Sequence, residues 1–341
     1  MAGSTSAGRR YGIGAVLVLL PAVLFLLAFV IGRFPVSPVT VARIILAQVL
    51  PITPDWPPVM ASVVLDVRLP RIAAAMLVGG GLAMAGAAYQ GVFRNPLVSP
   101  FTLGVSAGAG FGAALAILLF PQRYAIPVSA FIFGLASVGL CFAMARLYRA
   151  ASTLVLVLGG IIVSSLFTAL LALLKYVADP DGKLPVIEFW LMGSLSSVGN
   201  RDLLAVIAVI LPAALLLLAL RWRLNLLAMG DEQARILGVE PGRLRFVAVL
   251  LATMMAASAV SISGIIGWVG LVIPHLARML VGPDFRRVLP ASLSLGACYL
   301  LAIDAVARTA SAAEIPLGIL TAVIGAPVFM LLLRRSRLGW A

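Results

Sequence analysis

The residue types that most often perform chemistry are scarce in this sequence. Its 341 residues include one histidine, His275, and two cysteines, Cys141 and Cys298. Both cysteines lie inside apolar runs, where a thiol behaves as a small hydrophobic side chain. A single histidine is too few for a histidine-based metal site, and no cluster of histidine, cysteine or paired acids suggests a catalytic centre. We therefore expect neither an enzyme active site nor a bound metal.

Glycines recur every four residues at Gly104, Gly108 and Gly112. Small residues at this spacing allow two membrane helices to approach closely. The same stretch fits G-x-G-x-x-A through Gly108, Gly110 and Ala113, but it lacks the preceding strand and the downstream acid of a dinucleotide site. We interpret it as a helix-packing face. Because no G-x-x-x-x-G-K-[ST] pattern occurs, any ATP hydrolysis that powers this protein is expected on another chain.

Ionisable residues within apolar runs would indicate a proton or ion pathway. Asp304 and Arg308 are one helical turn apart near the end of such a run, at the spacing of an i,i+4 ion pair. Glu188 and Glu314 lie near proline-containing breaks, where capping of a helix end is as good an interpretation as a functional role. The lack of an acid at mid-depth argues against a proton-coupled carrier.

The composition determines the class of protein that must position these residues. Hydrophobic residues make up 62% of the chain and charged residues 11%, against about 25% charged in soluble domains. Disorder is excluded because it requires low hydrophobicity. The net charge of +13 comes from basic residues in short loops, a pattern that indicates membrane orientation rather than nucleic-acid binding. We expect an all-α polytopic protein surrounded by membrane lipid, with residues 1–341 forming one transmembrane domain.

Nine segments are long enough to cross the hydrocarbon core: 11–32, 70–93, 102–120, 126–147, 153–177, 202–220, 244–262, 285–307 and 315–333. A shorter segment, 265–280, brings the number to ten and places both termini on one side. Sixteen of the 25 Lys and Arg residues then lie on that side, which predicts cytoplasmic N- and C-termini. Residues 11–32 are too long for a typical signal peptide, so we expect a retained first helix.

The longest polar stretch on the predicted cytoplasmic side covers about residues 221–243. Asp231 and Glu232 suit the start of a short helix, because negative charge is favourable at the positive end of the helix dipole. Ala234 and Leu237 give this helix an apolar face, and Gly238 ends it. The helix either lies on the membrane or binds a partner, and its acidic residues favour a protein groove over anionic lipid. The predicted contact set is Gly230, Asp231, Glu232, Ala234, Arg235, Leu237 and Gly238.

A series of motifs resembles the FecCD family, the permeases of type II ABC importers for iron-siderophore, haem and cobalamin. The motifs occur in family order from Arg68 to the end of the chain. They are Arg68-Leu-Pro-Arg71, Asn95-Pro-Leu-Val-Ser-Pro100, Leu103-Gly-Val-Ser-Ala-Gly108, Trp190-Leu-Met-Gly-Ser194, Gly230-Asp-Glu-Gln-Ala-Arg-Ile-Leu-Gly238, Gly267-Trp-Val-Gly-Leu-Val-Ile-Pro-His-Leu-Ala-Arg278, Pro316-Leu-Gly-Ile-Leu-Thr321 and Gly325-Ala-Pro-Val-Phe329.

The resemblance implies a fold like that of the cobalamin importer permease, with ten helices in which helices 2–5 and 7–10 are inverted repeats. It also implies a homodimer in the bacterial inner membrane around one central path. Two ABC ATPase subunits, which carry ATP and Mg, would bind on the cytoplasmic side, and a periplasmic binding protein would dock on the other. This chain would therefore be a transporter subunit and not an enzyme.

The resemblance also implies roles for particular residues. The Gly230–Gly238 segment matches the coupling helix that binds the ATPase. Arg68, Arg71 and Arg308 match arginines that pair with glutamates of the binding protein, although contact with lipid headgroups, or the Asp304 pair for Arg308, would also explain them. Ser152 and Thr153 lie at the level of the cytoplasmic gate, where small hydroxyl residues equally well cap a helix.

These expectations give one leading function and several alternatives. The leading interpretation is ATP-driven import of a metal chelate, with ferric siderophore as the first choice of substrate. Haem, cobalamin or an oxyanion such as molybdate would fit the same importer type. An alternative of another class is a secondary carrier that works without an ATPase.

Overall fold

A computed structural model describes residues 2–32, 34–147 and 153–336, and the regular structure within these ranges is helical throughout. Six helical segments are long and apolar enough to cross a membrane. The first is one continuous stretch of 36 residues made of α3, η1 and α4. The six comprise α3 Pro58–Ser62 with η1 Val63–Arg68 and α4 Leu69–Phe93, α6 Ala125–Leu147, α7 Thr153–Val177, α9 Asn200–Met229, α11 Pro241–Ser263 and α13 Phe285–Thr309.

Four further helices contain shorter apolar stretches, which correspond to the other four segments expected from the sequence. These stretches are Gly12–Ala28 of α1 Ala2–Ala28, all of α5 Val105–Leu119 and α12 Val269–Val281, and Leu317–Leu332 of α14 Leu317–Ser336. Four short helices connect the bundle at its ends: α2 Pro38–Leu46, η2 Pro100–Leu103, α8 Lys183–Met192 and α10 Asp231–Ile236. The predicted all-α polytopic fold is thus confirmed for the described residues.

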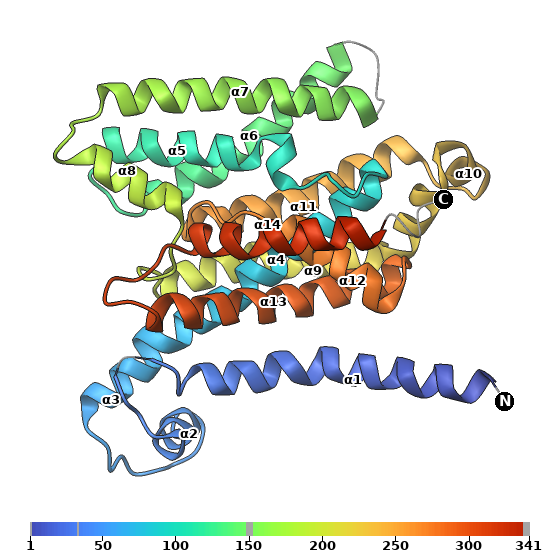
Figure 1. Cartoon of the computed structure of the whole chain (residues 1–341). Helices are drawn as coiled ribbons and strands as arrows, with labels where there is room; N and C mark the ends of the chain where they lie inside the picture. Colours follow the sequence, from blue (N-terminus) through green and yellow to red (C-terminus); the bar gives the residue numbers. More distant parts are fainter. Residues whose placement is uncertain (1, 33, 148–152, 337–341) are drawn as a thin grey trace.

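The helices run roughly side by side, so the bundle has two ends (Figure 1). The end that carries α10 also holds the start of α1 and the end of α14, and we call it the α10 end. The opposite end carries α2, α3 and α8, and we call it the α2 end. The helices α4 and α11 begin the two predicted inverted repeats, and they run in opposite directions between these ends.

The second spanning segment begins earlier than the sequence indicated. Continuous helix starts at Pro58, not near residue 70, and it passes through the π-helical turn Val63–Arg68 before α4 begins. The N–H of Leu69 bonds to the carbonyl of Val64, five residues back. Pro70 follows immediately and has no N–H to donate, so a wider turn just before it is physically reasonable.

Helix α4 lies at the centre of the bundle, and nearly all of its residues from Pro70 to Phe93 are buried. Its glycines make this position possible. A Cβ added at Gly79 would overlap the carbonyl oxygen of Gly296 on α13, and one added at Gly86 would overlap that of Gly270 on α12. Direct contact between backbones replaces side-chain packing at both crossings.

The glycine stripe predicted as a packing face occupies two kinds of position. Gly108 and Gly112 lie where α5 meets α6, and an added Cβ would overlap the carbonyl oxygens of Phe133 and Ser129. Gly104 instead precedes α5 with a φ of 81°, a conformation that favours glycine. It therefore ends the 3-10 turn of η2 and redirects the chain into α5.

We predict that Gly86→Ala lowers the thermal stability of the permease, because a methyl group at the α4–α12 crossing forces the backbones apart at a cost of about 1–3 kcal/mol. Gly139→Ala on α6 is a matched control, since a Cβ at Gly139 has no neighbour within 4 Å. Thermal denaturation of the purified detergent-solubilised variants measures the difference. Equal midpoints for the two variants would contradict this account of the crossing.

Candidate functional site

The short helix α10 is placed by glycines at both sides. Gly230 precedes it with a φ of 127° and Gly238 follows it with a φ of 78°, so both turns use backbone conformations that favour glycine. Pro241 then starts α11, where its missing N–H costs nothing. Most of the stretch 221–243 is therefore helical, because α9 continues to Met229 before α10 begins.

Asp231 fixes α10 to two other helices. Both of its carboxylate oxygens accept from Nη2 of Arg245 on α11, at 2.9 Å. The same carboxylate lies 3.8 Å from Nη2 of Arg94, the residue that ends α4 in a left-handed conformation. Arg245 is almost fully buried, so this ion pair is shielded from solvent on one side. Asp231 thus attaches the first turn of α10 to the ends of α4 and α11.

The apolar residues of α10 divide between two directions. Ala234 is completely buried against the bundle, whereas Leu237 is 54% exposed and its neighbour Ile236 is 79% exposed. The expected apolar face of Ala234 and Leu237 is therefore wrong as a single surface. Ala234 packs against the bundle and helps to hold α10 in place. Ile236 and Leu237 form a projecting apolar tip. Ile236 is absent from the predicted contact set, although its position next to Leu237 in a polar loop was a usable signal.

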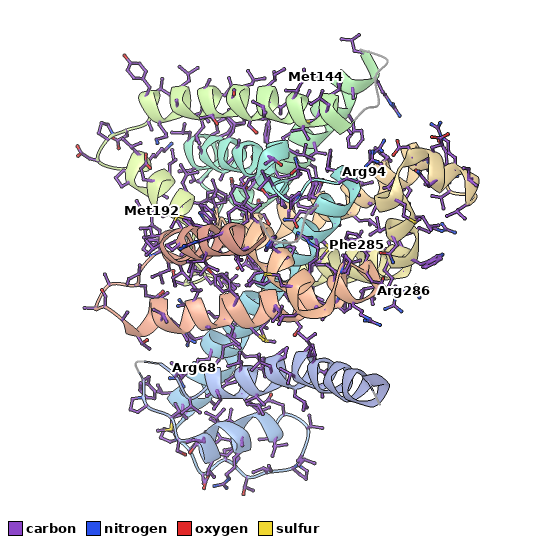
Figure 2. All side chains as sticks on the ribbon, turned by 45° about the vertical axis from the view of Figure 1, so that its right-hand side comes forward. Arg68, Arg94, Met144, Met192, Phe285 and Arg286 are labelled. Atoms are coloured by element: carbon purple, nitrogen blue, oxygen red, sulfur yellow. The ribbon has the colours of Figure 1, made fainter. Side chains whose placement is uncertain are left out.

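A second junction at the α10 end joins α9 to α13, and sequence reasoning missed it. The Nδ2 of Asn225 donates to Asp284 at 2.7 Å, and its Oδ1 accepts from the N–H of Phe285 at 2.8 Å. The ring of Phe285 fills the space left by Gly91 on α4. Figure 2 shows Arg94, Phe285 and Arg286 at this same end of the bundle. The signal available in the sequence was Asp284, a typical N-cap residue just ahead of an apolar run.

The charged groups at this junction, Asp284 and Arg286, both have favourable partners. The guanidinium of Arg286 lies over the ring of Trp222, 4.6 Å from its centroid. Partial burial of Asp284 disfavours its ionised form, but the N–H of Arg286, the amide of Asn225 and the nearby Arg286 and Arg287 more than offset this and keep its pKa below the usual range. The carboxylate therefore remains charged as it caps α13.

The α2 end carries a buried cluster of charged groups, which we call the arginine cluster: Arg68, Arg71, Asp304, Arg308 and Glu314. Nε of Arg71 donates to Asp304 at 2.9 Å, and its two terminal nitrogens donate to the two oxygens of Glu314 at 2.9 and 2.8 Å. Arg308 lies 2.9 Å from the other oxygen of Asp304. The i,i+4 pair expected from the sequence is thus confirmed, and it is part of a larger network.

The arginine cluster also holds the chain that follows α1. Arg68 donates to the carbonyls of Phe29 and Phe34, and Arg308 donates to that of Ile31 at 3.0 Å. These bonds give hydrogen-bond partners to carbonyls of an irregular segment. The cluster consequently joins the α1–α2 connection, α4, α13 and the α13–α14 connection.

The burial of these arginines corrects one expectation about their placement. Pairing with a docking protein or contact with lipid headgroups implies exposed guanidiniums, whereas Arg68, Arg71 and Arg308 are only 5%, 7% and 6% exposed. The reason is that they have internal partners, two carboxylates and several carbonyls, which compensate the cost of removing each charge from water. Whether they also contact a binding protein stays a prediction.

The remaining predicted residues have structural surroundings or lie outside the description. His275 is buried, with its ring 6.3 Å from that of Phe329 on α14. Cys141 and Cys298 are buried free thiols, and the described residues contain no group of three potential metal ligands. Ser152 lies outside the described residues. Thr153 begins α7, but its side chain is not described.

Comparison with known proteins identifies the family. The model of the FecCD transport family matches residues 19–335. The molybdate import system permease of Haemophilus influenzae is 43% identical over 95% of both chains. An iron chelatin transport system permease of Helicobacter pylori is 42% identical over 82% of this chain and 84% of its own. A solved structure of a metal-chelate type ABC transporter in an inward-facing conformation superposes with a TM-score of 0.85 and 42% identity, covering 95% of this chain and 99% of that one. The fold, the motifs and these matches agree, and the chain belongs to the FecCD transport family of ABC importer permeases.

Proposed function

We propose that this protein is the transmembrane permease of an ATP-driven importer that moves a ferric siderophore from the periplasm to the cytoplasm. The support for a metal chelate is the match to a metal-chelate type transporter over 95% of this chain at a TM-score of 0.85, together with 42% identity to an iron chelatin permease. The protein would lie in the bacterial inner membrane with its α10 end, and both termini, in the cytoplasm.

The partners follow from the two ends of the molecule. At the α10 end, the projecting tip of Ile236 and Leu237 would insert into a groove on a separate ABC ATPase, which binds ATP and Mg. This single feature carries the proposal of ATP coupling. The tip is exposed and apolar, and the ion pair of Asp231 with Arg245 holds its helix in place. Such a surface is better suited to contact with a protein partner than to contact with water. A second copy of the chain would complete the path, and α7 offers Leu158, Ile161 and Leu166 as exposed apolar residues for that contact.

At the α2 end, a periplasmic binding protein would dock near the arginine cluster and deliver the substrate. Guanidinium groups pair with carboxylates in a bidentate geometry that a point charge does not reproduce. The arginines Arg68, Arg71 and Arg308 would recognise acidic side chains of that protein. The residues Ser152 and Thr153 would lie at the cytoplasmic gate.

A second substrate has specific support. The permease from Haemophilus influenzae that matches 95% of this chain at 43% identity imports molybdate, so an oxyanion is the competing candidate. Haem and cobalamin are carried by further relatives, a hemin permease of Yersinia pestis and a cobalamin permease of Halobacterium salinarum, at 40% and 39% identity.

We expect proteoliposomes that contain the permease, its ATPase and its binding protein to accumulate radiolabelled ferrichrome only when ATP is enclosed with the ATPase. Molybdate, hemin and cobalamin, supplied in parallel, should not accumulate. Selective accumulation of molybdate would overturn the iron proposal and establish the oxyanion instead. Uptake by vesicles that contain the permease alone would favour a secondary carrier.

We further predict that Leu237→Asp leaves the permease folded but abolishes coupled transport. A carboxylate buried without a partner in the ATPase groove costs several kcal/mol of binding free energy. Leu97→Asp is a matched control, because Leu97 lies just beyond α4 and is 53% exposed, almost the same as the 54% of Leu237. Co-purification of the ATPase and ATP-dependent uptake are the readouts. Normal values of both for Leu237→Asp would show that α10 is not the ATPase contact.

A further inference from the structure

Within the arginine cluster, accessibility is very uneven. The side chain of Asp304 is completely buried and that of Arg71 is 9% exposed, whereas that of Glu314 is 31% exposed. An acidic group that approaches from outside the α2 end would therefore meet Glu314 first. The deeper carboxylate of Asp304 is out of its reach.

The geometry of Arg71 explains why this matters. Its guanidinium binds two carboxylates. Nε is bonded to Asp304, and the two terminal nitrogens Nη1 and Nη2, which we call the fork, are bonded to the two oxygens of Glu314. The fork is the part that binds a carboxylate in bidentate fashion. A foreign carboxylate can take this position only when Glu314 leaves it. Arg71 would keep the Asp304 partner throughout, so the exchange would not leave a buried charge without compensation.

Glu314 also holds the connection that leads into α14. It belongs to residues 310–316, which link α13 to α14 (Figure 1). Further bonds are made along this link: the N–H of Ile315 donates to Ala307 at 3.3 Å, the N–H of Leu317 donates to Gly193 at 2.9 Å, and Oγ of Ser311 donates to Ala313 at 2.8 Å. The bidentate pair with Arg71 joins this connection directly to α4. Its loss would remove this contact and leave the connection less firmly held.

We propose that Glu314 is an internal occupant of the Arg71 fork, and that an acidic side chain of the docking protein displaces it. The inference rests on the proposed docking at the arginine cluster and adds its regulation. In the undocked permease, Glu314 fixes the α13–α14 connection to α4. On docking, the incoming carboxylate binds the fork, Glu314 withdraws to solvent, and the α13–α14 connection loses this contact with α4. Recognition of the partner and movement of the connection are thereby one event.

The first test is the affinity of the binding protein for the assembled importer in lipid nanodiscs. Glu314→Gln keeps the size of the side chain and weakens its hold on the fork, so an incoming carboxylate meets less competition. We expect the Kd to fall about five- to tenfold, within the usual range of coupling between two sites. Glu188→Gln is the matched control, because Glu188 on α8 lies at the same end of the bundle, forms an ion pair at 2.6 Å with Lys175, and has a side chain that is 40% exposed. Its Kd should stay at the parent value.

Arg71→Lys separates the exchange from docking itself, since lysine keeps the charge and loses the fork. We expect this variant to bind the binding protein more weakly. If Arg71→Lys weakens binding while Glu314→Gln leaves it unchanged or also weakens it, docking stands and the exchange is wrong. If neither variant changes the Kd, docking at the arginine cluster is wrong, and the exchange is wrong with it.

A second measurement follows the connection directly and needs no change at Glu314. A nitroxide label at Ala313→Cys, with Cys141 and Cys298 replaced by alanine, reports the mobility of residues 310–316 by electron paramagnetic resonance. We expect the mobility to rise when the binding protein is added. Adding Glu314→Gln to this labelled protein should give the mobile spectrum before docking. A spectrum that does not change on docking at saturating binding protein would overturn the proposal.

Discussion

The direct contact of helix backbones along α4 is the constraint on which the rest of this structure depends. Gly79 meets Gly296 and Gly86 meets Gly270 without side chains between them. In lipid, apolar side chains gain little from leaving their surroundings, so close packing has to replace the hydrophobic effect as the source of helix association. These crossings place α4 inside a shell formed by α9, α11, α12 and α13, where almost every residue is buried.

Because α4 is central and continuous, the charged groups at its ends are held in a fixed relation. Arg71 takes part in the arginine cluster near one end, and Arg94 lies beside Asp231 at the other. The two residues are 23 positions apart in the sequence, which corresponds to about 35 Å of helix at 1.5 Å per residue. One well-packed helix thus joins the region proposed for the binding protein to the residues that hold α10 in place. The glycine crossings lie between these two regions, so a change in the separation of the helices there would alter the positions of both ends of α4.

The distribution of buried charge fits a protein that spans a membrane. The described acids and bases of the arginine cluster compensate one another, as burial requires. At the α10 end, Asp231 and Asp284 attach short segments to long helices and leave an apolar tip exposed. Polar chemistry is therefore used to position helix ends, and the middle of the bundle relies on small and apolar residues.

The sequence by itself determined the elements, since each depends on local chain properties. Apolar runs predicted ten helical segments, Asp231, Glu232 and Gly238 predicted the limits of α10, and the i,i+4 spacing predicted the pair of Asp304 with Arg308. Only the tertiary structure decided which residues far apart in the chain become partners. Arg71 and Glu314 are 243 positions apart, and Asn225 and Asp284 are 59 apart, so no periodicity links them. The same limit applies to exposure: Ala234 and Leu237 look alike as apolar residues of one short helix, but the packing of α9 and α11 against α10 buries the first and leaves the second at the surface.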